Sequence, residues 1–314
     1  MRIRLLTLCA LLLCGSVASA ADIRGAWTAL VKGDRVHLNV VRDHSNWGRS
    51  MPRAEFGLSD SQLNSASETP VHFTFTRDAG TIDFNGTFQS GEGVGRFTFT
   101  PSRSYAETLR SLNVPADSHF DDEDLFSLAM HDVSIAFIHD MQSLGYRQSL
   151  DEYIAFRIHG VTTDFVRELR SLGYDKLSAD DLVAFRIHGV TTDFVRELRS
   201  LGYDKLSADD LVTFRIHGVS SEFVRGMRDL GVKDLSADQL VAMRIHGVTI
   251  DYVRELRELG YSGLSSDDLV AMRIHGVTTR FIRDFADAGY HNIPVDKLVE
   301  MRIHGIQAPK NGRQ

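Results

Sequence analysis

Residues 182–198 have the sequence Leu-Val-Ala-Phe-Arg-Ile-His-Gly-Val-Thr-Thr-Asp-Phe-Val-Arg-Glu-Leu. The tetrapeptide Arg-Ile-His-Gly recurs from residues 157, 186, 215, 244, 273 and 302, a spacing of 29 residues at every step. Residues 161–189 and 190–218 match at 28 of 29 positions, the exception being Ala184 against Thr213. A constant period of this length is typical of a tandem repeat array. A degenerate copy precedes the array at residues 124–146.

Each repeat predicts two short helices. Ser178 is a typical N-cap residue, and Asp181 is placed to complete a capping box. The first helix should end at Gly189, which suits a left-handed C′ position, and Thr191 should cap a second helix over residues 192–201. Helices of about ten residues are marginal in water when isolated, so they must stack on neighbouring repeats. We therefore expect an α-solenoid of two-helix repeats over residues 103–306, followed by a tail at 307–314.

The preceding segment, residues 21–102, alternates apolar and polar side chains with period two, which predicts half-buried antiparallel strands. Short turns such as Lys32-Gly33-Asp34 separate the strands. We expect a small β meander of five or six strands that forms a barrel or a sandwich, so the fold class is multidomain α and β. Gly25-Ala26-Trp27 resembles the opening of lipocalin-like and avidin-like barrels, although about 80 residues are too few for an eight-stranded ligand barrel.

The first twenty residues predict a signal peptide: a basic start, an apolar run from Leu5 to Leu13, and small residues before Ala21. Both cysteines, Cys9 and Cys14, lie in this segment, so the mature chain would have no disulfide, thiol nucleophile or thiolate zinc site. Cleavage would remove two arginines and no acidic residue, taking the net charge from −7 to −9. We expect a soluble periplasmic or secreted protein with no membrane span and no nucleic-acid partner.

Two columns of the repeats predict structural roles. The first-helix arginines are Arg157, Arg186, Arg215, Arg244, Arg273 and Arg302. On a helical wheel Arg186 falls in the apolar arc of Val183, Phe185 and Ile187, so it must snorkel outward or pair with a group of the adjoining repeat. The histidine column is His131, His159, His188, His217, His246, His275 and His304. Equivalent histidines of stacked repeats are too far apart to share a zinc ion, and we expect them to cap helix C-termini.

The exposed positions of the second helix are the candidate partner-binding residues. These second-helix arginines are Arg167, Arg170, Arg196, Arg199, Arg225, Arg228, Arg254 and Arg257. Acidic residues at the second position of the first helix, of which Asp180 is one, are expected to face Arg196 and its equivalents in ion pairs. In the last unit Pro294 replaces the capping serine, so this unit is expected to be a degenerate cap.

Residues 182–198 resemble helical repeats of bacterial secreted proteins and of the C-terminal extensions of BlaR-type membrane metallopeptidases. The resemblance covers roughly residues 104–306 and implies an extracytoplasmic location. It does not imply catalysis, because the chain has no His-Glu-x-x-His motif and no match to the peptidase part.

The sequence has no catalytic motif of the kinds that hydrolases, nucleotide-binding proteins or zinc peptidases carry, and we expect no enzyme activity, cofactor or metal site. The predicted function is a non-enzymatic repeat scaffold that binds another envelope protein. One alternative is a ligand- or glycan-sensing module, with a candidate ligand loop at His44, Trp47 and Arg49 between two strands. A second alternative is a hydrolase whose site has no recognised motif.

Overall fold

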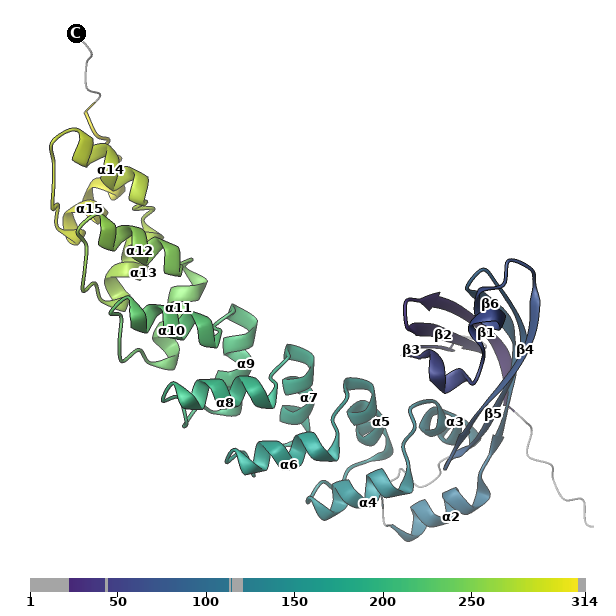
Figure 1. Cartoon of the computed structure of the whole chain (residues 1–314). Helices are drawn as coiled ribbons and strands as arrows, with labels where there is room; N and C mark the ends of the chain where they lie inside the picture. Colours follow the sequence, from purple (N-terminus) through teal and green to yellow (C-terminus); the bar gives the residue numbers. More distant parts are fainter. Residues whose placement is uncertain (1–22, 43–44, 113, 115–120, 310–314) are drawn as a thin grey trace, which may run out of the picture. The chain divides into compact units, whose positions relative to one another are not determined.

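The computed structural model describes residues 23–42, 45–112, 114 and 121–309 (Figure 1). The predicted signal peptide and His44 lie outside these residues. The chain forms two compact units that divide between Ala136 and Phe137, so the unit that holds the sheet extends beyond the predicted boundary at residue 102. Among the described residues, no helix combines the length and apolar character that a membrane span requires.

The first unit contains six strands and several short helices, in an order that agrees with the predicted β-rich segment. The elements are β1 (Ile23–Lys32), β2 (Arg35–Arg42), β3 (Ser45–Pro52), the 3-10 helix η1 (Arg53–Phe56), α1 (Asp60–Asn64), β4 (Thr69–Arg77), β5 (Gly80–Gln89), β6 (Glu92–Pro101), α2 (Arg103–Ser111) and α3 (Asp122–Met130). Helix α4 (Ile135–Ser143) spans the division between the units.

The strands form one antiparallel sheet in the order β3-β2-β1-β6-β5-β4. The predicted antiparallel pairing of sequence neighbours is found for all the strands except β3 and β4, which do not pair with each other, and β1 pairs with β6 as well as with β2. One sheet also rules out a two-sheet sandwich. Pairing of the first strand with the last is the closure that a meander barrel needs, but β3 and β4 remain edge strands, and η1 contacts both of them. The result is one six-stranded antiparallel sheet with β3 and β4 at its edges.

The core of this unit is aromatic. Trp27 is fully buried at the centre, and its ring meets Phe73, Phe84 and Phe88 at centroid distances of 5.3, 6.3 and 5.8 Å. Phe126 of α3 stacks on Phe97 of β6 at 5.3 Å, which fixes α3 on the inner face of the sheet. Buried aromatic pairs of this kind add about 0.5–1.5 kcal/mol each beyond the area they bury.

Two helices form in each repeat except the last, as predicted. The first helices are α5 (Leu150–His159), α7 (Ala179–His188), α9 (Ala208–His217), α11 (Ala237–Ile245), α13 (Ser266–Ile274) and α15 (Val295–Ile303). The second helices are α6 (Thr163–Ser171), α8 (Thr192–Ser200), α10 (Ser221–Asp229), α12 (Ile250–Glu258) and α14 (Thr279–Asp287). The last first helix, α15, is followed by no second helix within the described residues. The degenerate copy forms α3 and α4.

The local signals that predicted the helix ends are confirmed. Ser178 and Asp181 form a reciprocal capping box on α7, Gly189 ends that helix with a φ of 71°, and Thr191 caps α8. Pro294 makes no side-chain cap on α15, as expected for the last unit.

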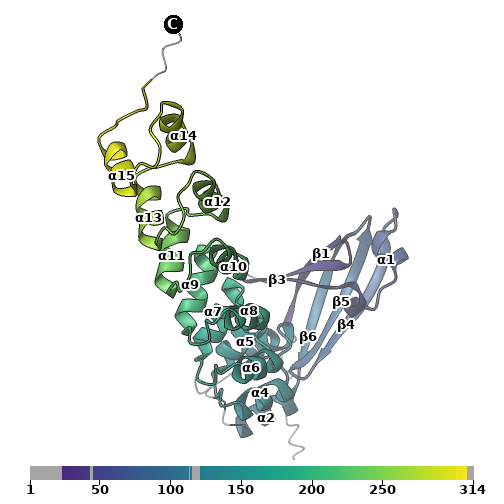
Figure 2. The same ribbon diagram turned by 60° about the vertical axis from the view of Figure 1, so that its left-hand side comes forward.

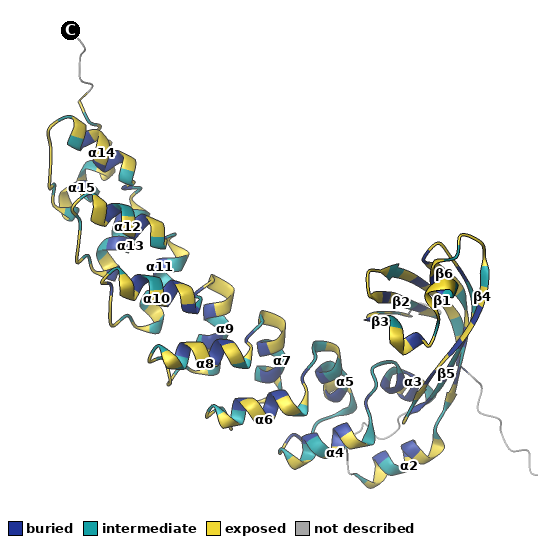
Figure 3. Cartoon of the chain, viewed as in Figure 1, coloured by how far each residue is buried: buried dark blue, intermediate teal, exposed yellow. Residues whose placement is uncertain are grey.

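Each first helix contacts the first helices of the neighbouring repeats, from α5 through α7, α9, α11 and α13 to α15, and the second helices contact one another in the same way (Figures 1 and 2). Buried residues occur on the helices of both sets (Figure 3). In the repeat formed by α7 and α8, the buried residues are Leu182 and Phe185 of the first helix and Phe194, Val195 and Leu198 of the second. The same apolar positions are buried in the other repeats from α5 to α14, so equivalent polar residues can be compared from one repeat to the next.

Candidate functional site

The first-helix arginines each lie over an aromatic ring of the preceding second helix. The Cζ atom of Arg186 is 5.0 Å from the centroid of Phe165, and that of Arg215 is 4.9 Å from Phe194. The other four pairs are Arg157 on Phe137, Arg244 on Phe223, Arg273 on Tyr252 and Arg302 on Phe281, at 4.9–5.3 Å. Nε of Arg186 also faces the carbonyl oxygen of His159 at 3.4 Å. The guanidinium therefore joins each first helix to the repeat before it, with a cation–π energy of about 0.5–2 kcal/mol.

Glycine in the Arg-Ile-His-Gly motif makes this contact possible. Gly160 has a φ of +73°, and a Cβ atom there would lie 3.0 Å from Nη2 of Arg186. The glycine thus ends one helix in a left-handed conformation and leaves room for the arginine of the next repeat. Two of the four residues of the motif are explained by contacts between repeats.

Second-helix arginines of the Arg196 type pair with carboxylates of the preceding second helix, of their own helix, or of both. Nη2 of Arg196 is 3.0 Å from Oε2 of Glu168 in the preceding repeat, and Nη1 is 2.5 Å from Asp193 of its own helix. Arg283 pairs with Glu255 at 2.9 Å in the same way. The expectation that Asp180 and its equivalents face this column is wrong, because the acidic partners belong to the second helices. Arg167 pairs with Asp164 at 3.0 Å and Arg254 with Asp251.

Second-helix arginines of the Arg170 type bind the end of the preceding second helix. Arg170, Arg199 and Arg228 donate to the carbonyl oxygens of Leu144, Leu172 and Leu201, respectively. These carbonyls stand at helix C-termini, where a cation is favoured by the helix dipole. The candidate partner-binding column is therefore already engaged within the array at these positions.

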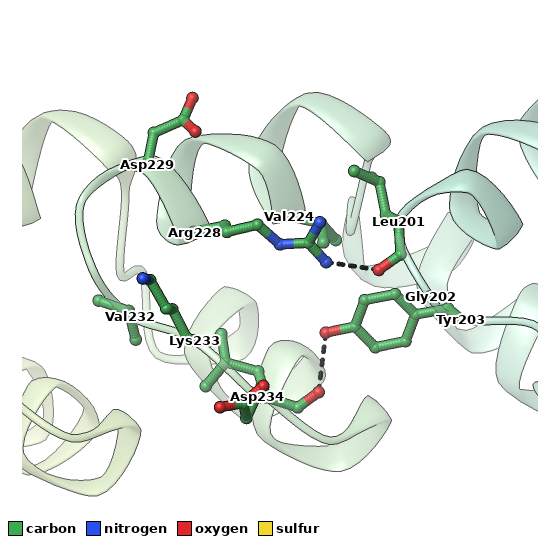
Figure 4. A pocket seen from close by; sticks show the side chains of 10 residues that line it. Leu201, Gly202, Tyr203, Val224, Arg228, Asp229, Val232, Lys233 and Asp234 are labelled. Atoms are coloured by element: carbon green, nitrogen blue, oxygen red, sulfur yellow. Dashed lines mark hydrogen bonds between the residues drawn. The ribbon is translucent and has the colours of Figure 1, made fainter.

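The hollow drawn in Figure 4 belongs to the same joint between repeats. Its volume is about 720 Å³, and two of the groups that line it hold neighbouring repeats together: Arg228 donates to the carbonyl of Leu201, and the Tyr203 hydroxyl donates to the carbonyl of Leu235 at 2.7 Å. The tyrosine contact recurs from Tyr146, Tyr174 and Tyr261 to Leu177, Leu206 and Ile293 at 2.8–2.9 Å. Burial raises the pKa of Tyr203, which keeps the phenol a donor. Val232 stands in this column and has no hydroxyl.

A second contact between repeats joins a glutamate to a hydroxyl one repeat later. Oε2 of Glu168 accepts from Thr192 at 2.6 Å, and Glu255 accepts from Thr279 at 2.6 Å. The hydrogen bond from Thr192 lowers the pKa of Glu168, with the bond from Arg196 as the next cause.

Both residues of this contact are replaced at one interface, the one between α10 and α12. Gly226 stands in the glutamate column and Ile250 in the threonine column. A Cβ atom at Gly226 would lie 2.5 Å from Cδ1 of Ile250, so the isoleucine occupies the space that the glutamate fills elsewhere. The two substitutions form one compensated change.

The isoleucine of the motif recurs in every repeat although its side chain is exposed, so packing between repeats does not explain its recurrence. Ile158, Ile187, Ile216, Ile245, Ile274 and Ile303 form the isoleucine column, and each is 54–59% exposed. The helical-wheel prediction that Ile187 belongs to the buried apolar arc is therefore wrong. Val183 and Ala184, one turn earlier on α7, are half-buried and extend this apolar surface. Six large apolar side chains exposed at one repeating position mark an interaction surface more clearly than scattered exposed residues do.

The histidine column lies beside the isoleucine column at the C-terminal ends of the first helices, and its capping role stays a prediction. His188 and His217 are the last residues of α7 and α9, and both are exposed. Within the described residues, no group of three His, Cys, Asp or Glu side chains is arranged to hold a metal ion.

Two of the three residues of the candidate ligand loop lie on a strand, and the third, His44, lies outside the described residues. Trp47 and Arg49 lie on β3 and pair in register with Val40 and Leu38 of β2. Trp47 meets Phe126 edge-on at 5.2 Å, and Nη1 of Arg49 donates to the carbonyl of Met130 at 3.4 Å. Both side chains therefore attach the sheet to α3, which removes the two described residues on which the ligand-sensing alternative depended.

Comparison with protein-family models, with curated proteins and with solved structures finds no match to this chain. The resemblance of the repeats to those of bacterial secreted proteins stays a prediction. The arguments for function therefore come from the chain's own geometry.

Proposed function

We propose that this chain is a non-enzymatic scaffold of the α-solenoid class, exported by its signal peptide, that binds another protein through the isoleucine column. The solenoid is supported by the contacts of every first helix with the first helices before and after it. Repeat proteins of this kind bind partners along one continuous face, to which each repeat contributes the same residues.

The observation that carries the proposal is that the other repeated residues contact neighbouring repeats, whereas the repeated isoleucine does not use most of its surface in this way. Arginine, glycine, tyrosine and glutamate columns hold neighbouring repeats together. Isoleucine recurs at the same frequency but leaves more than half of its surface in water. Partner binding is a function that uses an exposed apolar column. The proposed binding site is therefore at the C-terminal ends of the first helices and not at the second-helix arginines.

A double substitution in two near-identical repeats tests the proposal. Ile187→Ser with Ile216→Ser removes two members of the column at positions that are more than half exposed, and serine has a helix propensity similar to that of isoleucine. The matched control is Lys176→Ser with Lys205→Ser, at exposed loop positions of the same repeats.

We expect both variants to keep the circular dichroism spectrum and melting temperature of the unmodified chain. Tagged chains would be exposed to envelope extract, and retained proteins would be purified and tested for direct binding. A partner bound by the unmodified chain and the control but lost by the isoleucine variant supports the proposal. Equal binding by the isoleucine variant removes the column as the site.

A further inference from the structure

The isoleucine column dictates a spacing for whatever binds it. Successive first helices pack directly against each other, and packed helices lie about 8–10 Å apart. Each helix places its isoleucine at the same position, from Ile158 to Ile303. A ligand that contacts every isoleucine must therefore present an apolar group about every 8–10 Å.

A cationic arginine accompanies each isoleucine. Arg186 and His188 flank Ile187 in the sequence, and the Arg186 guanidinium is held against the ring of Phe165. A guanidinium fixed in this way is preorganised to pair with a carboxylate. The exposed acidic residue of the same helix, Asp180, is seven residues away, or roughly 10 Å along the helix axis. A chain that follows the isoleucine column thus meets apolar and basic groups in alternation.

The spacing discriminates among the conformations of a bound chain. Side chains on one face of a β-strand recur at about 6.6 Å or 13 Å, which does not match the column. In a polyproline II helix every third residue lies on the same side, with a repeat of about 9.3 Å, which matches. A partner α-helix along the column would cross the first helices nearly at right angles, the rarer class of helix packing.

On the basis of the proposed scaffold function, we propose that the isoleucine column binds an extended partner segment in the polyproline II conformation. The segment has an apolar side chain at every third residue and acidic side chains between them. The C-terminal tail of a second copy does not have this chemistry, since it contains Lys310 and Arg313 and no acidic residue.

Synthetic peptides provide a direct test with the full-length mature chain. The probe is a fluorescent 16-residue peptide of about five Leu-Pro-Glu units with a final leucine, whose length follows from six contacts at three-residue spacing. One control peptide has the same composition with leucines at irregular spacings, a second replaces glutamate by lysine, and a third is a helix-forming peptide with leucine at every seventh position. Anisotropy titration gives the dissociation constants.

We expect the period-three acidic peptide to bind at least about tenfold more tightly than each control peptide, with an affinity that falls as salt rises. Ile187→Ser with Ile216→Ser should weaken its binding by about tenfold or more, and Lys176→Ser with Lys205→Ser should leave it unchanged.

Equal affinity for the two leucine spacings, tighter binding of the helical peptide, or no binding of the period-three peptide would overturn the inference. If the isoleucine variant still loses an envelope partner in any of these cases, the scaffold function stands and only the form of its ligand is wrong. A dimer of the unmodified chain that dissociates in the isoleucine variant, measured by analytical ultracentrifugation, would assign the column to self-association and overturn it as well.

Discussion

The paired replacement at Gly226 and Ile250 predicts that two destabilising substitutions become compatible when combined. Gly226→Glu alone brings a Cβ atom within 2.5 Å of the Ile250 position, so the isoleucine must move. Overpacking of this kind lowers the free energy of unfolding by about 1–3 kcal/mol. Replacing a glycine within a helix raises it by about 1 kcal/mol, which offsets part of that loss. Ile250→Thr alone loses apolar contact at a half-buried position, at a cost of about 1 kcal/mol.

Together the two changes recreate the arrangement in which Glu168 accepts from Thr192. The overpacking disappears, so the double variant should be more stable than the sum of its single variants by about 1–3 kcal/mol. Urea unfolding followed by circular dichroism gives the free energy of unfolding of the unmodified chain, the two single variants and the double variant, which together form a double-mutant cycle.

The reverse exchange, Glu255→Gly with Thr279→Ile, installs the glycine–isoleucine arrangement at a neighbouring interface and should show coupling of the same sign. Additivity of the single effects within about 0.5 kcal/mol in both cycles would refute the interlocking contact between these columns.

Three further outcomes are expected. Ser178→Ala should lower the unfolding free energy by about 1 kcal/mol because it removes a capping box, whereas Pro294→Ala, where no cap exists, should change it by only a few tenths in the same urea titration. Burial raises the pKa of Tyr252 from 10.0 to about 12, so the unfolded chain ionises first and stability should fall as pH rises above about 10. Tyr252→Phe should flatten that slope of melting temperature against pH, and an unchanged slope would contradict this assignment. Trp47→Leu should lower the free energy of unfolding by about 1 kcal/mol, because it removes the edge contact with Phe126, and should leave partner capture intact. Loss of capture at unchanged stability would instead indicate that the sheet binds the partner.

Local sequence signals predicted the repeat helices well because caps and glycine stops act within a few residues. Ser178, Gly189 and Thr191 each take the predicted role. The place of Arg186 in an apolar arc also predicts that the cation needs a partner from the adjoining repeat, but it does not identify the Phe165 ring as that partner.

Contacts between distant residues could not be predicted in this way. A helical wheel of α7 cannot show how the adjoining repeats cover it, so the exposure of Ile187 was missed. The pairing of β1 with β6 and the contact of Trp47 with Phe126 join segments far apart in the sequence, and neither leaves a local pattern. The six-fold recurrence of isoleucine beside a charged residue was the one signal that could have revealed the column.

Val232 and Gly226 have a mechanical consequence, because both lie in the unit between Gly218 and Gly247. Neighbouring repeats are linked in series, so a pulling force is carried equally by every joint and acts first on the weakest. In this unit the tyrosine hydroxyl and the glutamate carboxylate that tie other repeats together are replaced by groups that cannot make hydrogen bonds. This joint therefore depends on the apolar contacts of Ile250 and Val232 where the others also have these hydrogen bonds, and we expect an applied force to separate the array here first.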